Sequence, residues 1–149
     1  MEAFKIGTEP NFIEFKLNTL YGFPNETDVD GGYAVEGSIS IQSGNYSVNN
    51  AVVWFSTGQV YQLYEQLKEA FHHLKGTILF SNRGEDIYFE MDFTRFGQIN
   101  VNGHFQEYPS IDNRLNFSFQ LDQSYIPSTL NELKKIVEVY GGMRGIKDK

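Results

Sequence analysis

Three segments in the second half of the chain alternate between apolar and polar residues. In residues 87–93 the apolar side chains stand at positions 87, 89, 91 and 93, with Tyr88, Glu90 and Asp92 between them. The same period of two recurs in residues 99–106 and 115–121. Because successive side chains of a β-strand point to opposite faces of its sheet, this period predicts three strands with one shared apolar face and one shared polar face.

Further strands are indicated upstream, and short turns separate them. Residues 13–18 and 35–42 show the same alternation, whereas residues 52–55 are apolar at every position. A strand without a polar side is typical of one that is covered on both faces. Turn residues such as Gly31-Gly32 and Asn82-Arg83-Gly84 lie between the segments. Connections this short favour antiparallel neighbours, since a parallel crossover needs roughly a dozen residues or more.

Two segments show the apolar period of 3.6 residues that is typical of amphipathic helices. The first covers about residues 57–74, with Ser56 or Thr57 as its N-cap. The second covers about residues 127–140 and ends before Gly141-Gly142.

Strands and helices together predict an α+β fold. We expect a curved antiparallel β-sheet of about six to eight strands, with two helices packed on its apolar face. The polar face is then left open. We expect a single α+β domain over residues 1–142, followed by a flexible basic tail over residues 143–149.

The composition excludes several kinds of site. The 149 residues include no cysteine, which rules out disulfides and thiolate metal ligands and fits a reducing cytoplasm. The first residues lack the basic region and apolar run of a secretion signal. No segment approaches the roughly 20 apolar residues of a membrane span. We therefore expect a cytoplasmic protein.

The net charge of −7 restricts the class of partner. An acidic surface is repelled by nucleic acids and by anionic membranes, and it attracts basic proteins. We therefore expect a protein partner, with no nucleic acid and no membrane. The oligomeric state stays open between a monomer and a weak dimer.

Catalytic and metal-binding patterns are weak. His72 and His73 are adjacent, so they point about 100° apart on a helix and do not share one metal ion. The acidic turn of residues 26–31 imitates the start of a calcium-binding loop, but Gly37 stands where the bidentate glutamate belongs, which favours a solvated hairpin loop. Nucleophile-elbow and phosphate-loop motifs are missing from the sequence. We expect no catalytic residue, no metal, no cofactor and no enzyme activity.

The predicted polar face is the main candidate for a binding surface, and the acidic loop is the second. Hydrogen-bonding groups combined with negative charge suit docking to a basic partner, because charge speeds encounter and polar matching gives specificity. The alternatives are an ordinary solvated face and a pair of catalytic carboxylates at Glu90 and Asp92. The candidate partner-binding residues are Glu26, Asp28 and Asp30 in the loop, and Glu90, Asp92, Asn100, Asn102, His104, Asn116 and Gln120 on the polar face.

Short motifs follow one another along most of the chain. They include Tyr21-Gly22-Phe23-Pro24, Gly31-Gly32-Tyr33, Ser43-Gly44-Asn45-Tyr46, Phe55-Ser56-Thr57-Gly58, Leu74-Lys75-Gly76, Val101-Asn102-Gly103, Asn113-Arg114-Leu115, Asp122-Gln123-Ser124-Tyr125-Ile126 and Tyr140-Gly141-Gly142. In this order and spacing they resemble the WapI-type family of bacterial immunity proteins. The chain departs from the family pattern at Gln98, where histidine is common, and at Ser124, where threonine is common.

The resemblance implies a cytosolic antidote to a contact-dependent, cell-wall-associated toxin. Such a protein binds the C-terminal toxic domain, often a nuclease that attacks RNA, and neutralises it without catalysis. Nucleases are basic because their substrate is polyanionic, so an acidic inhibitor fits. A small-ligand or carbohydrate-binding module that uses the polar face is the alternative function. We expect Asp122 and Ser124 to hydrogen-bond turn amides, with Tyr125 packed beneath.

Overall fold

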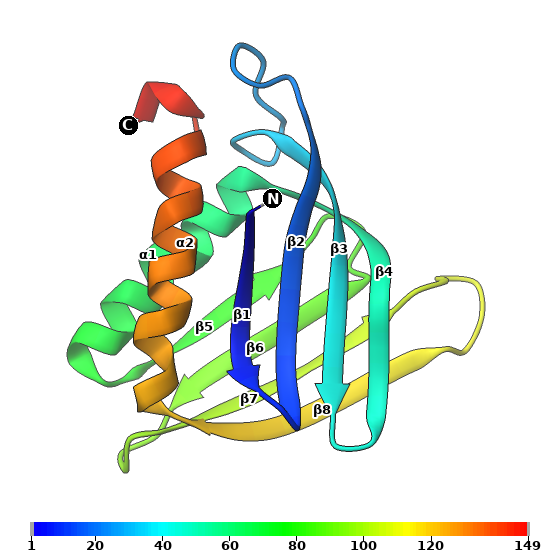
Figure 1. The fold of residues 1–149 in the computed structure, drawn as a ribbon, viewed down its shortest axis with the longest axis vertical. Coiled ribbons are helices and arrows are strands. Elements are labelled where there is room, and N and C mark those ends of the chain that lie inside the picture. The colour runs from blue at the N-terminus through cyan, green and yellow to red at the C-terminus, as the bar shows by residue number, and fades with distance from the viewer. Residues whose placement is uncertain (1, 149) are drawn as a thin grey trace.

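The computed structural model describes residues 2–148, which form eight β-strands and two α-helices (Figure 1). The elements are β1 (Glu2–Thr8), β2 (Asn11–Tyr21), β3 (Ala34–Ser43), β4 (Tyr46–Ser56), α1 (Thr57–His73), β5 (Gly76–Ser81), β6 (Ile87–Phe93), β7 (Gln98–Gln106), β8 (Arg114–Asp122) and α2 (Ile126–Tyr140). Two short 3₁₀ helices, η1 (Gln123–Tyr125) and η2 (Ile146–Asp148), precede and follow α2. The chain therefore runs through four strands and a helix twice.

The strands form two four-stranded sheets, with the orders β1-β2-β3-β4 and β5-β6-β7-β8. We call them the N-terminal and the C-terminal sheet. Every neighbouring pair is antiparallel, including β2 and β3, which are joined by the longer loop of residues 22–33. The predicted α+β class, antiparallel pairing and two helices are confirmed. The strands divide between two sheets instead of forming one curved sheet, because α1 separates β4 from β5 and β5 begins a new set of pairs.

The apolar faces of the two sheets cover each other. In Figure 1 the strands of the C-terminal sheet cross behind those of the N-terminal sheet. Phe15 of β2 is fully buried between them, and its ring stacks on Phe4 of β1 at 4.9 Å between centroids. The same ring meets Phe80 of β5 at 5.3 Å and Phe89 of β6 at 6.3 Å. One phenylalanine thus joins both layers of the core, where offset and edge-on contacts between rings are favourable.

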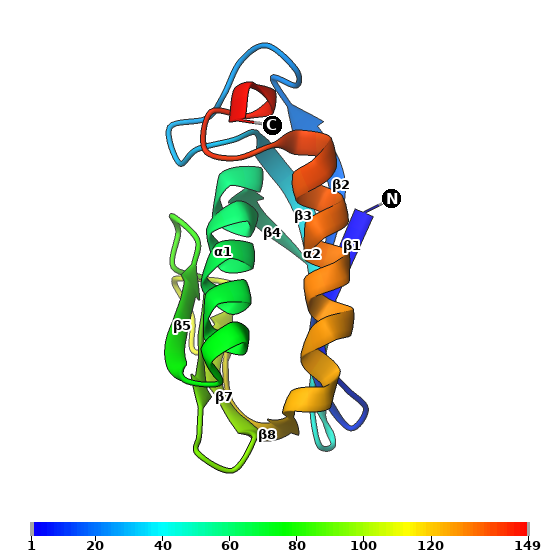
Figure 2. The same ribbon diagram turned by 90° about the vertical axis from the view of Figure 1, so that its left-hand side faces the viewer.

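The helices close one side of this sandwich instead of covering an apolar face. Figure 2 shows α1 and α2 side by side, α1 next to β5 and α2 next to β1. Gln66 of α1 accepts from the N–H of Leu79 at 3.1 Å and donates to its carbonyl at 3.2 Å. In α2, Thr129 donates to the carbonyl of Lys5 at 2.6 Å and Glu132 accepts from its N–H at 3.0 Å. Side chains thus satisfy the edge strands β5 and β1, which would otherwise expose unpaired backbone groups.

Helix boundaries agree with the sequence prediction to within one residue. Ser56 caps α1, and its hydroxyl accepts from the N–H of Gln59 at 3.1 Å while the Gln59 side chain accepts from the Ser56 N–H. This reciprocal pair is a capping box. Leu74 ends α1 in the left-handed conformation, with φ 53°.

Strand β4 corrects one prediction. Residues 52–55 were expected to be covered on both faces, but β4 is the last strand of its sheet. Val53 and Phe55 point into the core, whereas Val52 is 58% exposed and Trp54 is 50% exposed. Both helices pack at the other edge of the sandwich, against β1 and β5, so these two side chains stay at least half exposed.

Residues 143–148 lie against the loop between β2 and β3. The N–H of Gly32 donates to the carbonyl of Met143 at 2.8 Å, and the N–H of Ile146 donates to the Tyr33 hydroxyl at 3.0 Å. The flexibility expected of the tail stays a prediction. Met1, the first residue of the expected domain, and Lys149, the last residue of the tail, lie outside the described residues.

Removing the ring that joins the two sheets should destabilise the protein strongly. Phe15→Ala is expected to lower the free energy of unfolding by about 3–5 kcal/mol, because a fully buried aromatic leaves a cavity between the layers. Urea denaturation followed by circular dichroism measures this loss. Phe96→Ala is the matched control, since Phe96 is 84% exposed and should change stability by less than about 0.5 kcal/mol. Equal losses in the two variants would contradict the assigned core.

Candidate protein-binding surface

The outer face of the C-terminal sheet brings seven of the predicted residues together, and we keep the name polar face for it. Three rows of directly paired residues cross β6, β7 and β8. They are Tyr88–His104–Asn116, Glu90–Asn102–Ser118 and Asp92–Asn100–Gln120. Side chains paired in this way lie about 4.5–5.5 Å apart at Cβ, so the rows form one continuous array.

This face is open to solvent. Asp92, Asn116, Ser118 and Gln120 are exposed, and the other members of the three rows are partly exposed. The helices contact β1, β5 and each other rather than the outward side of β6–β8. A partner can therefore reach the polar face without any rearrangement of the described residues.

The carboxylates of the polar face are oriented by neutral donors. Glu90 accepts from the Tyr88 hydroxyl at 2.9 Å, and Asp92 accepts from the Thr77 hydroxyl at 3.0 Å. The ion pairs found within residues 2–148 include neither carboxylate. Their negative charges are held in place and are available to a cationic partner.

A shallow cavity of about 430 Å³ lies at one end of the polar face. It is lined by Ser81, Glu85, Tyr88, His104 and Arg114. The His104 ring stacks on Tyr88, with centroids 5.7 Å apart and planes inclined by 25°. Partial burial, and then the nearby Arg114 charge, lower the pKa of His104 below its ordinary 6.5. His104 is therefore uncharged at neutral pH and can both donate and accept a hydrogen bond.

Asp122 extends the negative charge beyond the end of the array. Its carboxylate accepts from the Ser124 N–H at 2.9 Å and from the Gln98 amide at 3.1 Å. The hydrogen bonds from Ser124 lower the pKa of Asp122. The turn role predicted for Asp122 is confirmed, but Tyr125 is 45% exposed, and the residue packed into the core is its neighbour Ile126.

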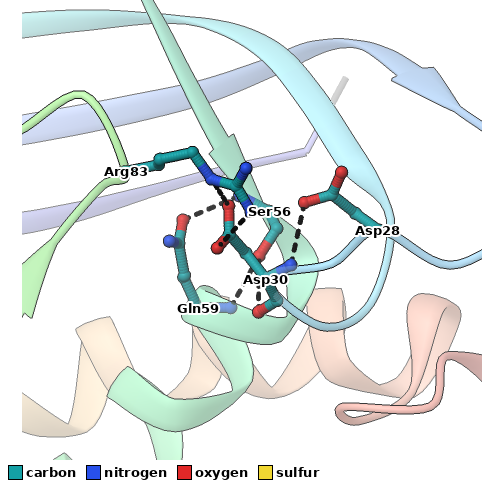
Figure 3. Close-up of polar contacts among 5 residues, drawn as sticks. All are labelled: Asp28, Asp30, Ser56, Gln59 and Arg83. Carbon is teal, nitrogen blue, oxygen red and sulfur yellow. Dashed lines mark hydrogen bonds and ion pairs between the residues drawn. The ribbon is translucent and has the colours of Figure 1, made fainter.

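The three predicted loop residues lie elsewhere, between β2 and β3. Figure 3 shows two of them, Asp28 and Asp30. Asp28 accepts from the N–H of Asp30 at 3.1 Å. Asp30 in turn receives two bonds from the Arg83 guanidinium, from Nε at 3.0 Å and from Nη2 at 2.9 Å. The charge of Asp30 is thus compensated within the chain. Glu26 is exposed, whereas Asp28 and Asp30 are partly buried. The loop and the polar face are two separate surfaces.

Sequence reasoning missed the aromatic and basic residues around these surfaces. Tyr88 and Arg114 line the cavity on the polar face, and Arg83 anchors the acidic loop. For Arg83, the only signal in the sequence is the turn motif Asn82-Arg83-Gly84. This motif predicts a turn, but it does not predict which residue the Arg83 side chain contacts. The contact depends on a residue 53 positions earlier in the chain.

The described residues offer few other kinds of site. Within residues 2–148, no group of three or more His, Asp or Glu side chains could hold a metal ion. Neither α1 nor α2 combines the length and the apolar character needed to cross a membrane.

The α+β sandwich leaves an acidic, hydrogen-bonding sheet face open, and such a face is electrostatically complementary to a basic protein. Comparison with protein families makes the assignment specific. Residues 4–141 match the Immunity protein WapI-like family, so the chain belongs to that family. The resemblance drawn from the sequence motifs is confirmed. No curated protein matches the chain.

Replacing Arg114 should raise the pKa of His104. The Arg114 charge disfavours the imidazolium, so Arg114→Gln should shift the His104 titration toward 6.5, as measured by NMR. In the parent protein, the pKa of His104 is lower in the folded state than in the unfolded chain. Below pH 6.5 the unfolded chain therefore binds more protons, and the free energy of unfolding decreases as the pH falls through the folded-state pKa. Arg95→Gln makes the same change in net charge outside the cavity. Identical His104 titrations in the two variants would argue against the Arg114 contribution.

Proposed function

We propose that this protein is an immunity protein that binds and neutralises the toxic C-terminal domain of a cognate bacterial toxin. The observation that carries the proposal is the match to the immunity family over residues 4–141. The protein acts in the cytoplasm, without catalysis and without a cofactor, by occupying a surface of the toxin domain.

The polar face is the contact surface in this proposal. Glu90 and Asp92 supply negative charge that no cation of residues 2–148 pairs with, and the amides of the neighbouring strands supply donors and acceptors. A nuclease domain is basic because it binds a polyanion, so the two surfaces attract each other over a distance. The rigid sheet fixes the positions of the polar groups before the partner arrives, which reduces the entropic cost of binding.

Co-expression provides the direct test of the function. We expect the neighbouring gene to encode the toxin. Its C-terminal domain should arrest growth when expressed alone, and this protein should restore growth. The purified pair should elute as one complex in size-exclusion chromatography. Continued growth arrest together with separate elution of the two proteins would refute the immunity function for this pair.

Charge reversal on the polar face tests the surface separately. Glu90→Lys combined with Asp92→Lys should weaken toxin binding about tenfold or more, mainly through slower association, because a basic partner then meets like charge. Surface plasmon resonance at several salt concentrations measures this effect. Glu69→Lys with Glu138→Lys, on the exposed sides of α1 and α2, changes the net charge equally and should leave affinity within about twofold. Unchanged affinity in the first variant, with thermal melting intact in both, would move the interface away from this face.

A further inference from the structure

Two large aromatic side chains lie half exposed on the outer face of the N-terminal sheet. Trp54 of β4 is 50% exposed and Tyr21 of β2 is 47% exposed. Their rings stack at 5.7 Å between centroids, with planes inclined by 29°. Aromatic side chains exposed together in this way are enriched at protein interfaces, where they gain free energy by leaving water.

One carboxylate lies beside this aromatic pair. Glu36 of β3 stands directly opposite Trp54 in the strand register, and its carboxylate accepts from the Tyr21 hydroxyl at 3.3 Å. Desolvation, followed by the charge of Glu36 and its hydrogen bond, raises the pKa of Tyr21, so Tyr21 stays a neutral donor. The pair therefore presents ring faces next to a carboxylate.

A cleft of about 390 Å³ opens beside Trp54, between the β2–β3 loop and the β5–β6 turn. We call it the aromatic cleft. Its wall includes Trp54, Asp28, Asp30, Asn82, Arg83 and Asp86. Asn82 donates to the Trp54 carbonyl at 2.9 Å, which fastens the turn to β4 and holds the cleft open. The Arg83 guanidinium is already bound by Asp30, so the remaining carboxylates, Asp28 and Asp86, give the cleft a negative charge.

These features select one kind of occupant. A cation over an indole ring is attracted by the ring's negative face, and tryptophan is the most favourable of the aromatic residues for this contact. A planar guanidinium can stack on the ring and at the same time donate to carboxylates in its plane, which a compact ammonium does less well. Anionic side chains are repelled by the same carboxylates. The chemistry therefore favours arginine.

We infer that the aromatic cleft receives an arginine side chain of the protein partner. The inference rests on the proposed function and extends it to a surface that adjoins the polar face. Ser81 and Glu85 line the cavity on the polar face, whereas Asn82, Arg83 and Asp86 line the aromatic cleft. The cleft and the cavity at the end of the polar face are thus separated by a single turn, Asn82–Asp86, and a partner that contacts both extends around this turn.

The single tryptophan makes the cleft directly observable, because Trp54 is the only one in the chain. In complex with a tryptophan-free variant of the toxin domain, Trp54 fluorescence should shift and become protected from acrylamide quenching. Trp54→Leu should weaken the complex about tenfold, and Trp54→Phe should recover part of the loss. Phe96→Leu, the same kind of change at another exposed aromatic, should have no effect. Thermal melting confirms that each variant folds.

A second arm of the experiment does not need the toxin. An arginine-rich tripeptide amide should change Trp54 fluorescence saturably, whereas a glutamate tripeptide should not. Glu36→Gln with Asp28→Asn removes two charges but retains hydrogen-bond acceptors, and it should weaken the arginine response several-fold.

The outcomes separate the two proposals. Toxin binding with unchanged Trp54 fluorescence and unaltered affinity in Trp54→Leu would overturn the arginine site and leave the immunity function standing. Failure of toxin binding together with a charge-dependent arginine response would refute the function for that pair and support the cleft. Trp54 fluorescence that changes with the concentration of this protein, but not with added toxin domain or arginine peptide, would assign the cleft to a second copy of the chain. This outcome would overturn the inference.

Discussion

The contact between the two apolar sheet faces is the interaction on which the rest of the structure depends. Phe15 illustrates it, because its ring meets aromatic partners from both sheets. Each sheet buries its inner face on the other, so neither needs a helix to cover it, and both outer faces are left toward solvent. The binding surface is thus a consequence of how the core is closed. A single sheet with helices on its apolar side would also have one open face, but it would have no cleft between two sheets' loops.

The helices have a role that complements this packing. Gln66 bonds both backbone groups of Leu79 in β5, and Thr129 and Glu132 bond those of Lys5 in β1. Edge strands that are covered in this way cannot recruit further strands, which protects a sheet protein from edge-to-edge association. Because α1 and α2 cover the β5 and β1 edges, the surfaces that remain accessible include the polar face and β4. The cavity at the end of the polar face and the aromatic cleft lie on either side of the Asn82–Asp86 turn.

Much of the polar face was predictable because it depends on local pattern and register. Glu90, Asn102 and their neighbours were placed on one face by the period of two, and antiparallel pairing between consecutive strands aligned them. Strands β1 and β5 were missed, because only Phe4 and Ile6, and only Ile78 and Phe80, repeat the period there, whereas β6 has four such apolar residues. Trp54 was misjudged for a different reason. An apolar run does not reveal whether its strand lies in the middle of a sheet or at its end.

The sequence by itself determined both helices and most of the strands, the inward and outward sides of those strands, the N-cap of the first helix and the acidic character of the surface. These properties follow from side-chain periodicity, capping chemistry and charge, which act over a few residues. Only the tertiary structure decided that the strands divide into two sheets, that the helices cover edges, and that Arg83 meets Asp30 and Trp54 stays exposed. An apolar strand face is buried equally well by a helix or by another sheet. The alternating pattern therefore predicts that the apolar face is buried, and the packing of distant segments determines which element buries it.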